Sequence, residues 1–441
     1  KESNVRFELR KYRTASKWTF FFVHSVFLFE KRRVLKEEKM KKNNMILDNA
    51  EFFTSEPQEL KDFFQEREES AIWYSDETNC RADDIRFQPI FDEPICVPAE
   101  VNKLKAAKTV KFDSSEEAYA DTMYAPDFGY YGSTQMMFVG GHLYPVGISA
   151  IKGMTERAGI KVEGWDKLRK ANPSDLSDVL GKFMKATDGY LTVLVEDEKV
   201  RAVNSGRYAA CPASTVLNAV NQWIDNEYPD AKFVNAYANH DYAIWRIDLE
   251  KYTDDVLGAF PELKNNGFVP AMTVSLSHTG TSSVSFTPCL RVGDIYFPIC
   301  EGINTPHIAK GKFSERMAAM ESAVKTNLFS VFPKISEVSK RIDSMRNINV
   351  SNAYNALLRG MKSLGLPKIQ AMEAAEQFKQ LFGSTASAYD IYMAVVDTLA
   401  YVTRDFPNDY RKQVSVAKSM ERAVVGIDWA KLGNIPGDFS W

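Results

Sequence analysis

The spacing of apolar residues changes near residue 313, and this change limits the fold more than any other feature of the sequence. Between residues 189 and 300, β-branched and aromatic residues gather in short runs that mostly alternate apolar with polar positions, with polar turns between them. Such alternation is typical of strands that have one face on a core and the other face available. Because no Gly-rich βαβ repeat occurs, the pattern argues against a doubly wound nucleotide-binding fold.

After residue 313 the spacing is helical. From Ser314 to Met345, apolar residues recur every three or four positions, which predicts a long amphipathic helix that Pro333 breaks or kinks. The sequence therefore predicts an α+β fold, with a mainly antiparallel central sheet over about 190–300 and a helical C-terminal region packed on it. Further helices are expected over residues 351–364, 368–382, 386–404 and 408–425.

The region before residue 189 mixes short helices with loops, and a hairpin follows it. Two β-rich runs within 189–208 are separated by the polar residues Glu196 to Lys199, which is typical of a β-hairpin. A short amphipathic helix is expected within 46–70, after Thr54 or Ser55. Further helices are expected over 148–158, 174–187 and 212–225, and strands near 87–97, 232–238, 242–248, 270–276, 283–290 and 293–299. We divide the chain into an N-terminal α+β segment (40–188), a β-rich core (189–313) and a helical C-terminal region (314–441).

Residues 1–39 differ from the rest of the chain in charge. They hold eleven Lys or Arg and five Asp or Glu, whereas the remainder has an acidic excess of nine. Their apolar run at 18–29 is shorter than the roughly 20 residues of a membrane span, and it lacks the small-residue cleavage site of a signal peptide. Residues 36–40 (KEEKM) can be encoded by a purine-rich ribosome-binding site and a start codon. We therefore expect 1–39 to be a translated leader and the true start to be Met40 or Met45.

Composition fits an ordinary globular protein without a disulfide framework. The chain has 441 residues, of which 45% are hydrophobic and 26% charged. The five cysteines (Cys80, Cys96, Cys211, Cys289 and Cys300) are widely spaced and none forms a C-x-x-C pair, which argues against a zinc knuckle and against disulfide staples. A reducing bacterial cytoplasm is the expected compartment, with no association with a membrane.

Standard catalytic motifs do not occur. The sequence contains no G-x-S-x-G elbow, Walker loop, G-x-G-x-x-G or H-E-x-x-H. The histidines after Met40 are His142, His240, His278 and His307, and none of them pairs at metal-ligand spacing. We therefore expect neither a metal nor a cofactor, and the motifs leave open whether the protein is an enzyme.

Two elements resemble a known family. The run from Lys199 to Tyr208 (KVRAVNSGRY) is similar to the R-A-x-x-S-x-R-Y element of the phage- and plasmid-borne proteins grouped as domain-of-unknown-function family nine-thirty-two, although Gly206 stands where that family commonly has an acid. The segments 277–280 (SHTG) and 307–313 (HIAKGKF) are similar to a later block of the same family. The resemblance implies a cytoplasmic protein of a mobile genetic element, and it implies no particular reaction.

The candidate binding residues are cations, histidines and one tyrosine. Arg201 and Arg207 could bind phosphate or carboxylate, or could form structural ion pairs. Tyr208 could stack on a base or pack in the core, and His278 could act as a base or simply bond to backbone in its turn. A second group surrounds Gly311 before the long helix, where a helix N-terminus favours an anion. This group consists of His307, Lys310, Lys312 and Arg316, with Arg291 on a nearby strand; either a bound phosphate or the acids Glu301 and Glu315 would compensate it.

Three functions remain open on this basis. The first is an accessory protein of a mobile element that binds single-stranded DNA or RNA through the sheet and these cations, either as a monomer or as a homo-oligomer. The second is an enzyme acting on a phosphorylated or nucleotide-like small molecule, with Arg291, His278 and His307 in one pocket. The third is a counter-defence protein that binds another protein through its helical tail. An exposed basic track favours the first function, a closed polar pocket the second, and an exposed apolar patch the third.

Overall fold

A computed structural model of the chain describes part of its length. The expected leader at 1–39 and both expected start residues lie outside the described residues, as do most of the expected strand at 87–97 and of the expected helix at 408–425. The described residues are 51–89, 135–157, 164, 173–258, 268–292, 295–403, 419, 422–437 and 439–441.

The described part of the chain is built around one large antiparallel sheet, called here the main sheet. It has seven strands in the order β1-β8-β9-β10-β11-β12, with β13 also paired to β11. This confirms the predicted α+β fold with a mainly antiparallel sheet. The strands are β1 (Glu51–Thr54), β8 (Lys232–Asn239), β9 (Tyr242–Asp248), β10 (Val269–Ser277), β11 (Val284–Val292), β12 (Ile295–Pro298) and β13 (Ile303–Thr305).

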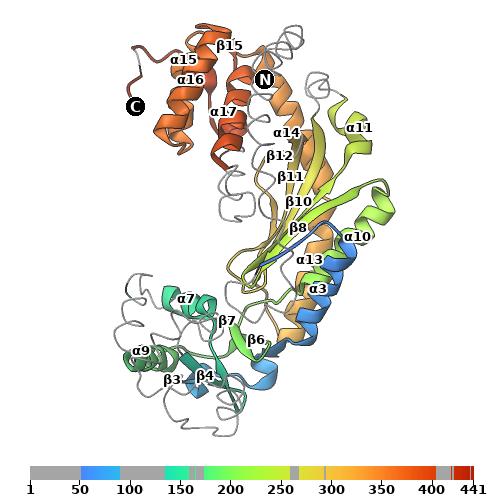
Figure 1. The fold of residues 1–441 in the computed structure, drawn as a ribbon, viewed down its shortest axis with the longest axis vertical. Coiled ribbons are helices and arrows are strands. Elements are labelled where there is room, and N and C mark those ends of the chain that lie inside the picture. The colour runs from blue at the N-terminus through green and yellow to red at the C-terminus, as the bar shows by residue number, and fades with distance from the viewer. Residues whose placement is uncertain are drawn as a thin grey trace, which may run out of the picture.

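One face of the main sheet is apolar and carries the protein's largest core. Alternate residues such as Trp245, Val274 and Phe286 are fully buried there. Four helices supply the other side of this core and run along the same side of the sheet (Figure 1). They are α3 (Pro57–Glu69), α10 (Ala213–Glu227), α13 (Phe313–Leu328) and α14 (Val331–Ser344), and together with the sheet they form the main body.

A small body with its own core is inserted between α3 and α10. It contains two three-stranded antiparallel sheets, β2-β6-β7 and β3-β4-β5, and its apolar residues form a separate cluster. The hairpin predicted around Glu196–Lys199 is present, but it pairs with β2 rather than joining the main sheet. The elements are β2 (Ile72–Tyr74), β3 (Arg86–Pro89), β4 (Gln135–Val139), β5 (His142–Pro145), α7 (Ile148–Arg157), α9 (Pro173–Lys185), β6 (Leu191–Glu196) and β7 (Lys199–Ser205).

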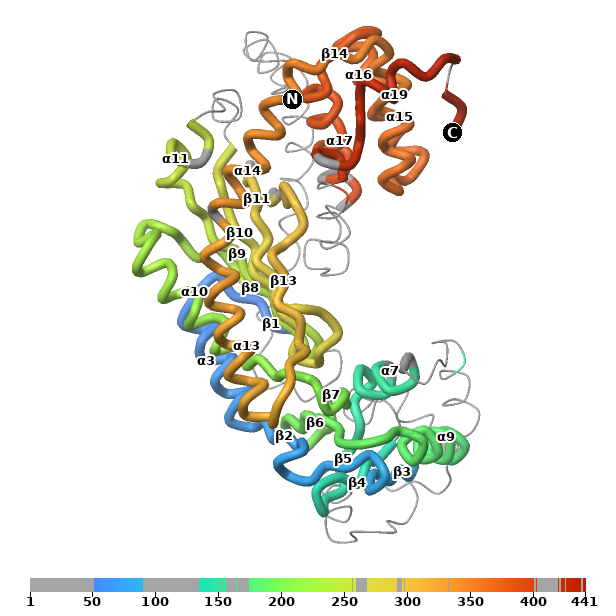
Figure 2. The backbone as a smooth tube through the Cα atoms, turned by 180° about the vertical axis from the view of Figure 1, so that it is seen from behind, coloured from blue at the N-terminus to red at the C-terminus, as the bar shows by residue number. Residues whose placement is uncertain are grey.

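The helical C-terminal region lies at the opposite end of the main body from the small body (Figure 2). The predicted long helix is two helices, because the chain breaks at Phe329–Ser330; Pro333 lies in the first turn of α14, where its missing N–H is tolerated. Trp429 is buried and its Nε1 donates to the Ala423 carbonyl at 2.9 Å, so the tail is pinned as expected. The helices here are α15 (Ala353–Ser363), α16 (Lys368–Phe382), α17 (Ala388–Thr403) and α19 (Trp429–Gly433), with a π-helix at Arg422–Gly426.

Several short elements complete the described fold. They are α11 (Thr253–Leu257), the two-stranded pair β14 (Asn349–Val350) with β15 (Ala386–Ser387), and the 3-10 turns η3 (Asp76–Thr78), η4 (Ala82–Asp84), η5 (Glu250–Tyr252) and η6 (Met345–Asn347).

The two faces of the main sheet should respond differently to truncation. Phe286 is fully buried, so Phe286→Ala should lower the free energy of unfolding by about 3–5 kcal/mol through lost contacts and a cavity. Phe53 is 53% exposed on the opposite face, so Phe53→Ala should change it by about 0.5 kcal/mol or less. Urea unfolding followed by circular dichroism measures both values, and equal losses would show that the sheet is not one-sided.

Candidate functional site

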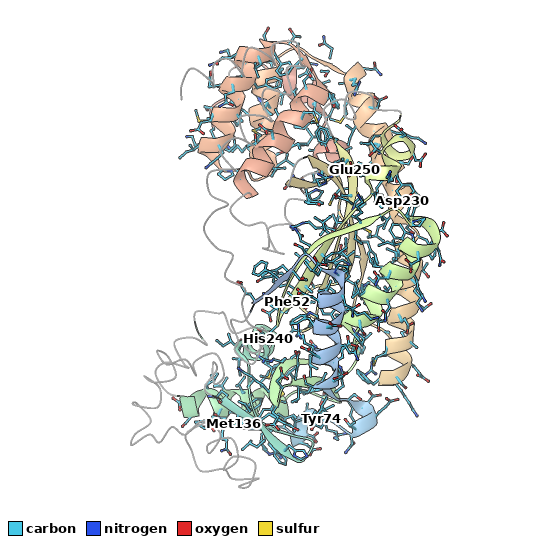
Figure 3. The ribbon with its side chains drawn as sticks, turned by 45° about the vertical axis from the view of Figure 1, so that its right-hand side comes forward. Phe52, Tyr74, Met136, Asp230, His240 and Glu250 are labelled. Carbon is cyan, nitrogen blue, oxygen red and sulfur yellow. The ribbon has the colours of Figure 1, made fainter. Side chains whose placement is uncertain are left out.

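The small body meets the main body around two paired backbone segments, residues 207–209 and 307–309. The Ala209 amide donates to the His307 carbonyl at 3.1 Å, and the Ala309 amide donates to the Arg207 carbonyl at 3.2 Å. We call this region the junction. Figure 3 shows His240, in the β8–β9 turn, at the end of the main sheet nearest Tyr74 and Met136 of the small body.

Tyr208 and His307 are buried in the junction. The Tyr208 ring lies between Trp73 and His307, at centroid distances of 6.0 Å and 5.1 Å. His307 Nδ1 donates to the Ala209 carbonyl at 2.9 Å. Phe313, the first residue of α13, packs on the same cluster. Tyr208 therefore packs in a small core, which is the alternative to base stacking that the sequence left open.

Arg316 is a structural residue that ties α13 to the small body. Its side chain is 3% exposed, and Nη2 forms an ion pair with Asp76 at 2.9 Å. Nε donates to the Tyr208 carbonyl at 3.1 Å, and Nη1 donates to the Gly311 carbonyl at 2.6 Å. These partners occupy the guanidinium, so Arg316 is not presented to a ligand in this structure.

Carboxylates occupy the N-terminus of α13, where the sequence suggested a phosphate. Glu315 accepts from the Lys312 amide at 2.9 Å, and Glu77 accepts from the Ser314 hydroxyl at 2.7 Å. Acids are favourable at this end of the helix dipole. Glu315 was one of the two compensating acids that the sequence offered, whereas Glu77 lies 237 residues from Ser314 and no local pattern points to it.

Three of the predicted cations lie on the surface beside the junction. Arg207, Lys310 and Lys312 are exposed, and they border the paired backbone segments. Ile308, whose backbone pairs with Tyr208, is 64% exposed. We call Arg207, Lys310 and Lys312 the basic loop.

His278 lies next to this region in the turn between β10 and β11. Its amide donates to the Asp241 carbonyl at 3.0 Å, and its ring is edge-on to Phe64 at 5.9 Å. The turn also packs on Tyr208, because a Cβ added to Gly280 would come within 2.5 Å of that ring. The Nε2 atoms of His278 and His307 are both shut off from solvent, and neither has a hydrogen-bond partner among the described residues.

Buried charges link α3 to the β6–β7 hairpin. Arg67 Nη2 donates to Glu196 at 2.9 Å, and Nη1 donates to the Asn239 carbonyl at 3.0 Å. The two charged side chains are 8% and 3% exposed. The sequence did not reveal this pair, since 129 residues separate its members. On the adjacent strand, Lys199 and Arg201 are also buried and both have interaction partners.

Arg291 does not join the histidines. His278 lies in the turn just before β11, whereas Arg291 lies near the other end of that strand. Six residues separate Arg291 from Ser285 at the start of β11, which is about 20 Å at the rise of an extended strand. Arg291 forms an ion pair with Asp248 at 2.8 Å, and Asp248 also accepts from the Tyr296 hydroxyl at 3.0 Å. Within the described residues, the structure therefore does not gather Arg291, His278 and His307 into one pocket.

The face of the main sheet opposite the helices is polar and aromatic. Phe53 packs on Tyr237 at 4.8 Å, and Tyr237 packs on Tyr242 at 5.7 Å, so the rings form a row across three strands. Farther along, Arg246 lies over the Tyr296 ring at 5.2 Å. We call this surface the polar face. Its exposed or half-buried members are Glu51, Phe53, Asn235, Asn239, Tyr242, Arg246, Asp248, Thr287, Arg291 and Tyr296. Tyr237, Ile244, Ala271, Thr273, Ser275, Ser285 and Cys289 lie on the same face and are buried.

The described residues form no cluster of metal-ligating side chains, and burial disfavours the thiolate of Cys80 and Cys211. In the part of the chain that is described, no three His, Cys, Asp or Glu side chains are placed to hold a metal ion. Burial raises the pKa of Cys80 and of Cys211 to about 12, so neither thiol is a ready nucleophile at neutral pH. Of the helices described, none has the length and apolar character needed to cross a membrane.

No protein-family model, no curated protein and no solved structure matches this chain. The resemblance of 199–208, 277–280 and 307–313 to the phage- and plasmid-borne family remains a prediction.

Breaking the Arg67–Glu196 pair should be costly. Glu196→Gln leaves the Arg67 charge buried without its partner, which lowers the free energy of unfolding by about 3–5 kcal/mol. The matched control is Glu321→Gln, which removes an exposed ion pair with Lys325 and should cost about 0.5 kcal/mol or less. Urea unfolding of both variants measures the difference, and a Glu196→Gln loss no larger than the control would show that the pair is not buried in solution.

Acid should destabilise the protein through His278 and His307. Burial lowers the pKa of His278 well below its ordinary value, and the nearby Arg67 and His307 add to this; burial also lowers the pKa of His307, partly offset by its hydrogen bond to Ala209. The unfolded chain therefore binds more protons below about pH 6.5, and stability falls as the pH drops below that value. At pH 5 the free energy of unfolding should be lower by up to about 2 kcal/mol for each histidine.

The measurement compares urea unfolding of the wild type and of a His278→Gln/His307→Gln variant between pH 8 and pH 5. Carboxylates titrate in both proteins, so the difference between the two profiles isolates the histidines. Profiles that stay parallel over this range would contradict the prediction.

Proposed function

We propose that the protein binds single-stranded nucleic acid on the polar face of its main sheet, as an accessory protein of a mobile genetic element. The observation that carries this proposal is the row of rings formed by Phe53, Tyr237 and Tyr242 on the face opposite the helices. Proteins that bind single strands without sequence preference combine such aromatic side chains with nearby cations, because every base has a face that can stack.

The rings at the two ends of this aromatic row are more exposed than the ring in the middle, which favours base stacking at the ends. Phe53 is 53% exposed and Tyr242 is half-buried, whereas Tyr237 is buried between them. Stacking of one base on an aromatic side chain contributes about 1–3 kcal/mol. Asn235 and Arg246, which are linked by a hydrogen bond of 3.1 Å, add amide and guanidinium groups along the same face.

The basic loop supplies a local positive charge within residues 40–441, which have an acidic excess of nine. It lies near the β10–β11 turn, since β13 pairs with the start of β11 and leads directly into residues 306–312. A backbone of phosphates that crosses the polar face toward this turn would meet Arg207, Lys310 and Lys312. Phosphate contacts of this kind make binding dependent on salt.

The setting in a mobile element rests on the resemblance of residues 199–208. Within that run, Arg201 and Tyr208 are buried and Arg207 is exposed. Tyr208 packs in the junction and Arg201 is a buried residue of β7, so Arg207 is the exposed cation of this run that is available to a ligand.

A second function is favoured by a different surface. An open groove on α13 lies beside Phe329, which is 59% exposed. This apolar side chain supports the alternative of a protein-binding factor, because exposed aromatic residues are favoured at protein interfaces.

Binding to labelled oligomers tests the main proposal. The full chain is titrated with single-stranded DNA, single-stranded RNA and duplex DNA over a range of salt concentrations, with fluorescence anisotropy as the readout. Replacing Arg207, Lys310 and Lys312 together by Gln should flatten the dependence of log K on log salt by about 2, at about 0.7 per lost contact. The Phe53→Ala/Tyr242→Ala variant should weaken binding about tenfold or more at every salt concentration.

A control variant carries the same change of charge on the helical side. Replacing Lys325, Lys340 and Arg341 by Gln removes three exposed cations from α13 and α14 and should leave binding nearly unchanged. Circular dichroism establishes that each variant is folded. If no oligomer binds at low salt, the proposal fails and the partner-binding alternative is favoured; if the control weakens binding as much as the basic-loop variant, the polar face is not the site.

A further inference from the structure

The basic loop is held in place by a small number of contacts, and two histidines take part in them. The backbone bonds of Ala209 and Ala309 close the paired segments. His307 belongs to one of these segments, and its ring stacks on Tyr208, which belongs to the other. His278 supports the same tyrosine from the side, through the turn that contains Gly280.

The hydrogen bond of His307 fixes which ring nitrogen carries the proton. A carbonyl oxygen can only accept, so Nδ1 carries the hydrogen that it donates to Ala209. In the neutral ring Nε2 is then a bare acceptor, and it is buried with no partner in the described part of the chain. A second proton on this ring would create a buried N–H and a positive charge with nothing described to receive them, which is unfavourable.

The charged groups around the two rings come from every neighbouring element. Arg67 on α3 and Arg316 on α13 are cations, and each is already engaged by a carboxylate: Glu196 on β6 and Asp76 on η3. The β8–β9 turn contributes Asp241, which reaches His278 through its backbone carbonyl, and His240, which has an interaction partner of its own. The β7 side chain Asn204 is neutral and donates to the Thr279 carbonyl at 3.2 Å.

We propose that His278 and His307 form an acid-sensitive lock that holds the basic loop against the main body. With both imidazoles neutral, residues 207–209 and 307–309 stay paired; protonation of either ring opens the pair and releases Arg207, Lys310 and Lys312. The lock is a property of the junction, and it does not depend on what the basic loop binds. The lowered pKa of both histidines agrees with it.

We expect the opening to be local because the rings at the junction form a cluster apart from the main core, although Ala209 itself belongs to that core and Ala309 packs against it. Trp73, Tyr208, Ala210 and Phe313 form a small apolar cluster of their own, distinct from the core under the main sheet. Segments with few buried apolar contacts open without global unfolding. Charging a buried histidine is a known way to bias such a two-state element between about pH 5 and 7.

Amide hydrogen exchange of the full chain tests the lock directly. The reporters are the amides of Ala209 and Ala309, whose bonds close the pair, and the controls are amides in the middle of β9 and β10. Each histidine stays neutral while the junction is closed and has its ordinary pKa of about 6.5 when the junction is open. Each pH unit below 6.5 therefore favours the open state about tenfold. After correction for intrinsic exchange, protection of Ala209 and Ala309 should therefore fall at least tenfold from pH 7.5 to pH 5.5 and stay well below that of the controls, whose own loss only follows the fall in the free energy of unfolding.

A variant that cannot be charged separates the lock from general acid sensitivity. In the His278→Gln/His307→Gln variant the loss of protection between the two pH values should shrink to less than threefold, since a glutamine amide at position 307 can still donate to the Ala209 carbonyl. Equal protection of the wild type at both pH values overturns the proposal, and so does an undiminished loss in the variant. If the double variant does not fold, the two single variants are measured, and wild-type losses in both overturn the proposal.

Discussion

The one-sidedness of the main sheet is the constraint on which the rest of the structure depends. The large apolar core lies on one face, and burying that face requires helices from both before and after the sheet in the chain. Helix α3 comes from the start of the described chain, α10 precedes β8, and α13 and α14 follow β13. Because all four pack on the same side, the junction and the polar face remain as the surfaces where polar chemistry can gather.

Much of this arrangement follows from local pattern. The alternation of polar and apolar residues predicted the strands between 232 and 299, and the structure confirms them as β8 to β12. Helical spacing predicted α10, α15, α16 and α17 within a few residues. The position of the break between α13 and α14 was not predicted, because a proline in the first turn of a helix costs little and does not itself mark the break.

The candidate site was harder to predict from the sequence, because partners distant in the chain decide which of its residues are buried and which are exposed. Arg316 and Arg207 are the same residue type and lie close together in the structure, yet Asp76 and two carbonyl groups engage one of them and the other is exposed. Tyr208 became a core residue because Trp73 and Phe313 reach it from separate elements. No residue near 196 signals that Arg67 of α3 will meet Glu196 at the end of β6, because 129 residues separate the two.

The path of the chain through the main sheet has a consequence for the order of folding. Strand β1 pairs with β8, so that Tyr237 donates a hydrogen bond to Glu51, 186 residues earlier in the chain. The whole small body lies between these two strands, and the entropy of closing so long a loop must be met before their pairing adds stability. We therefore expect β8 to β13 to assemble first and to present an unpaired β8 edge, a surface prone to association, until β1 docks and closes it.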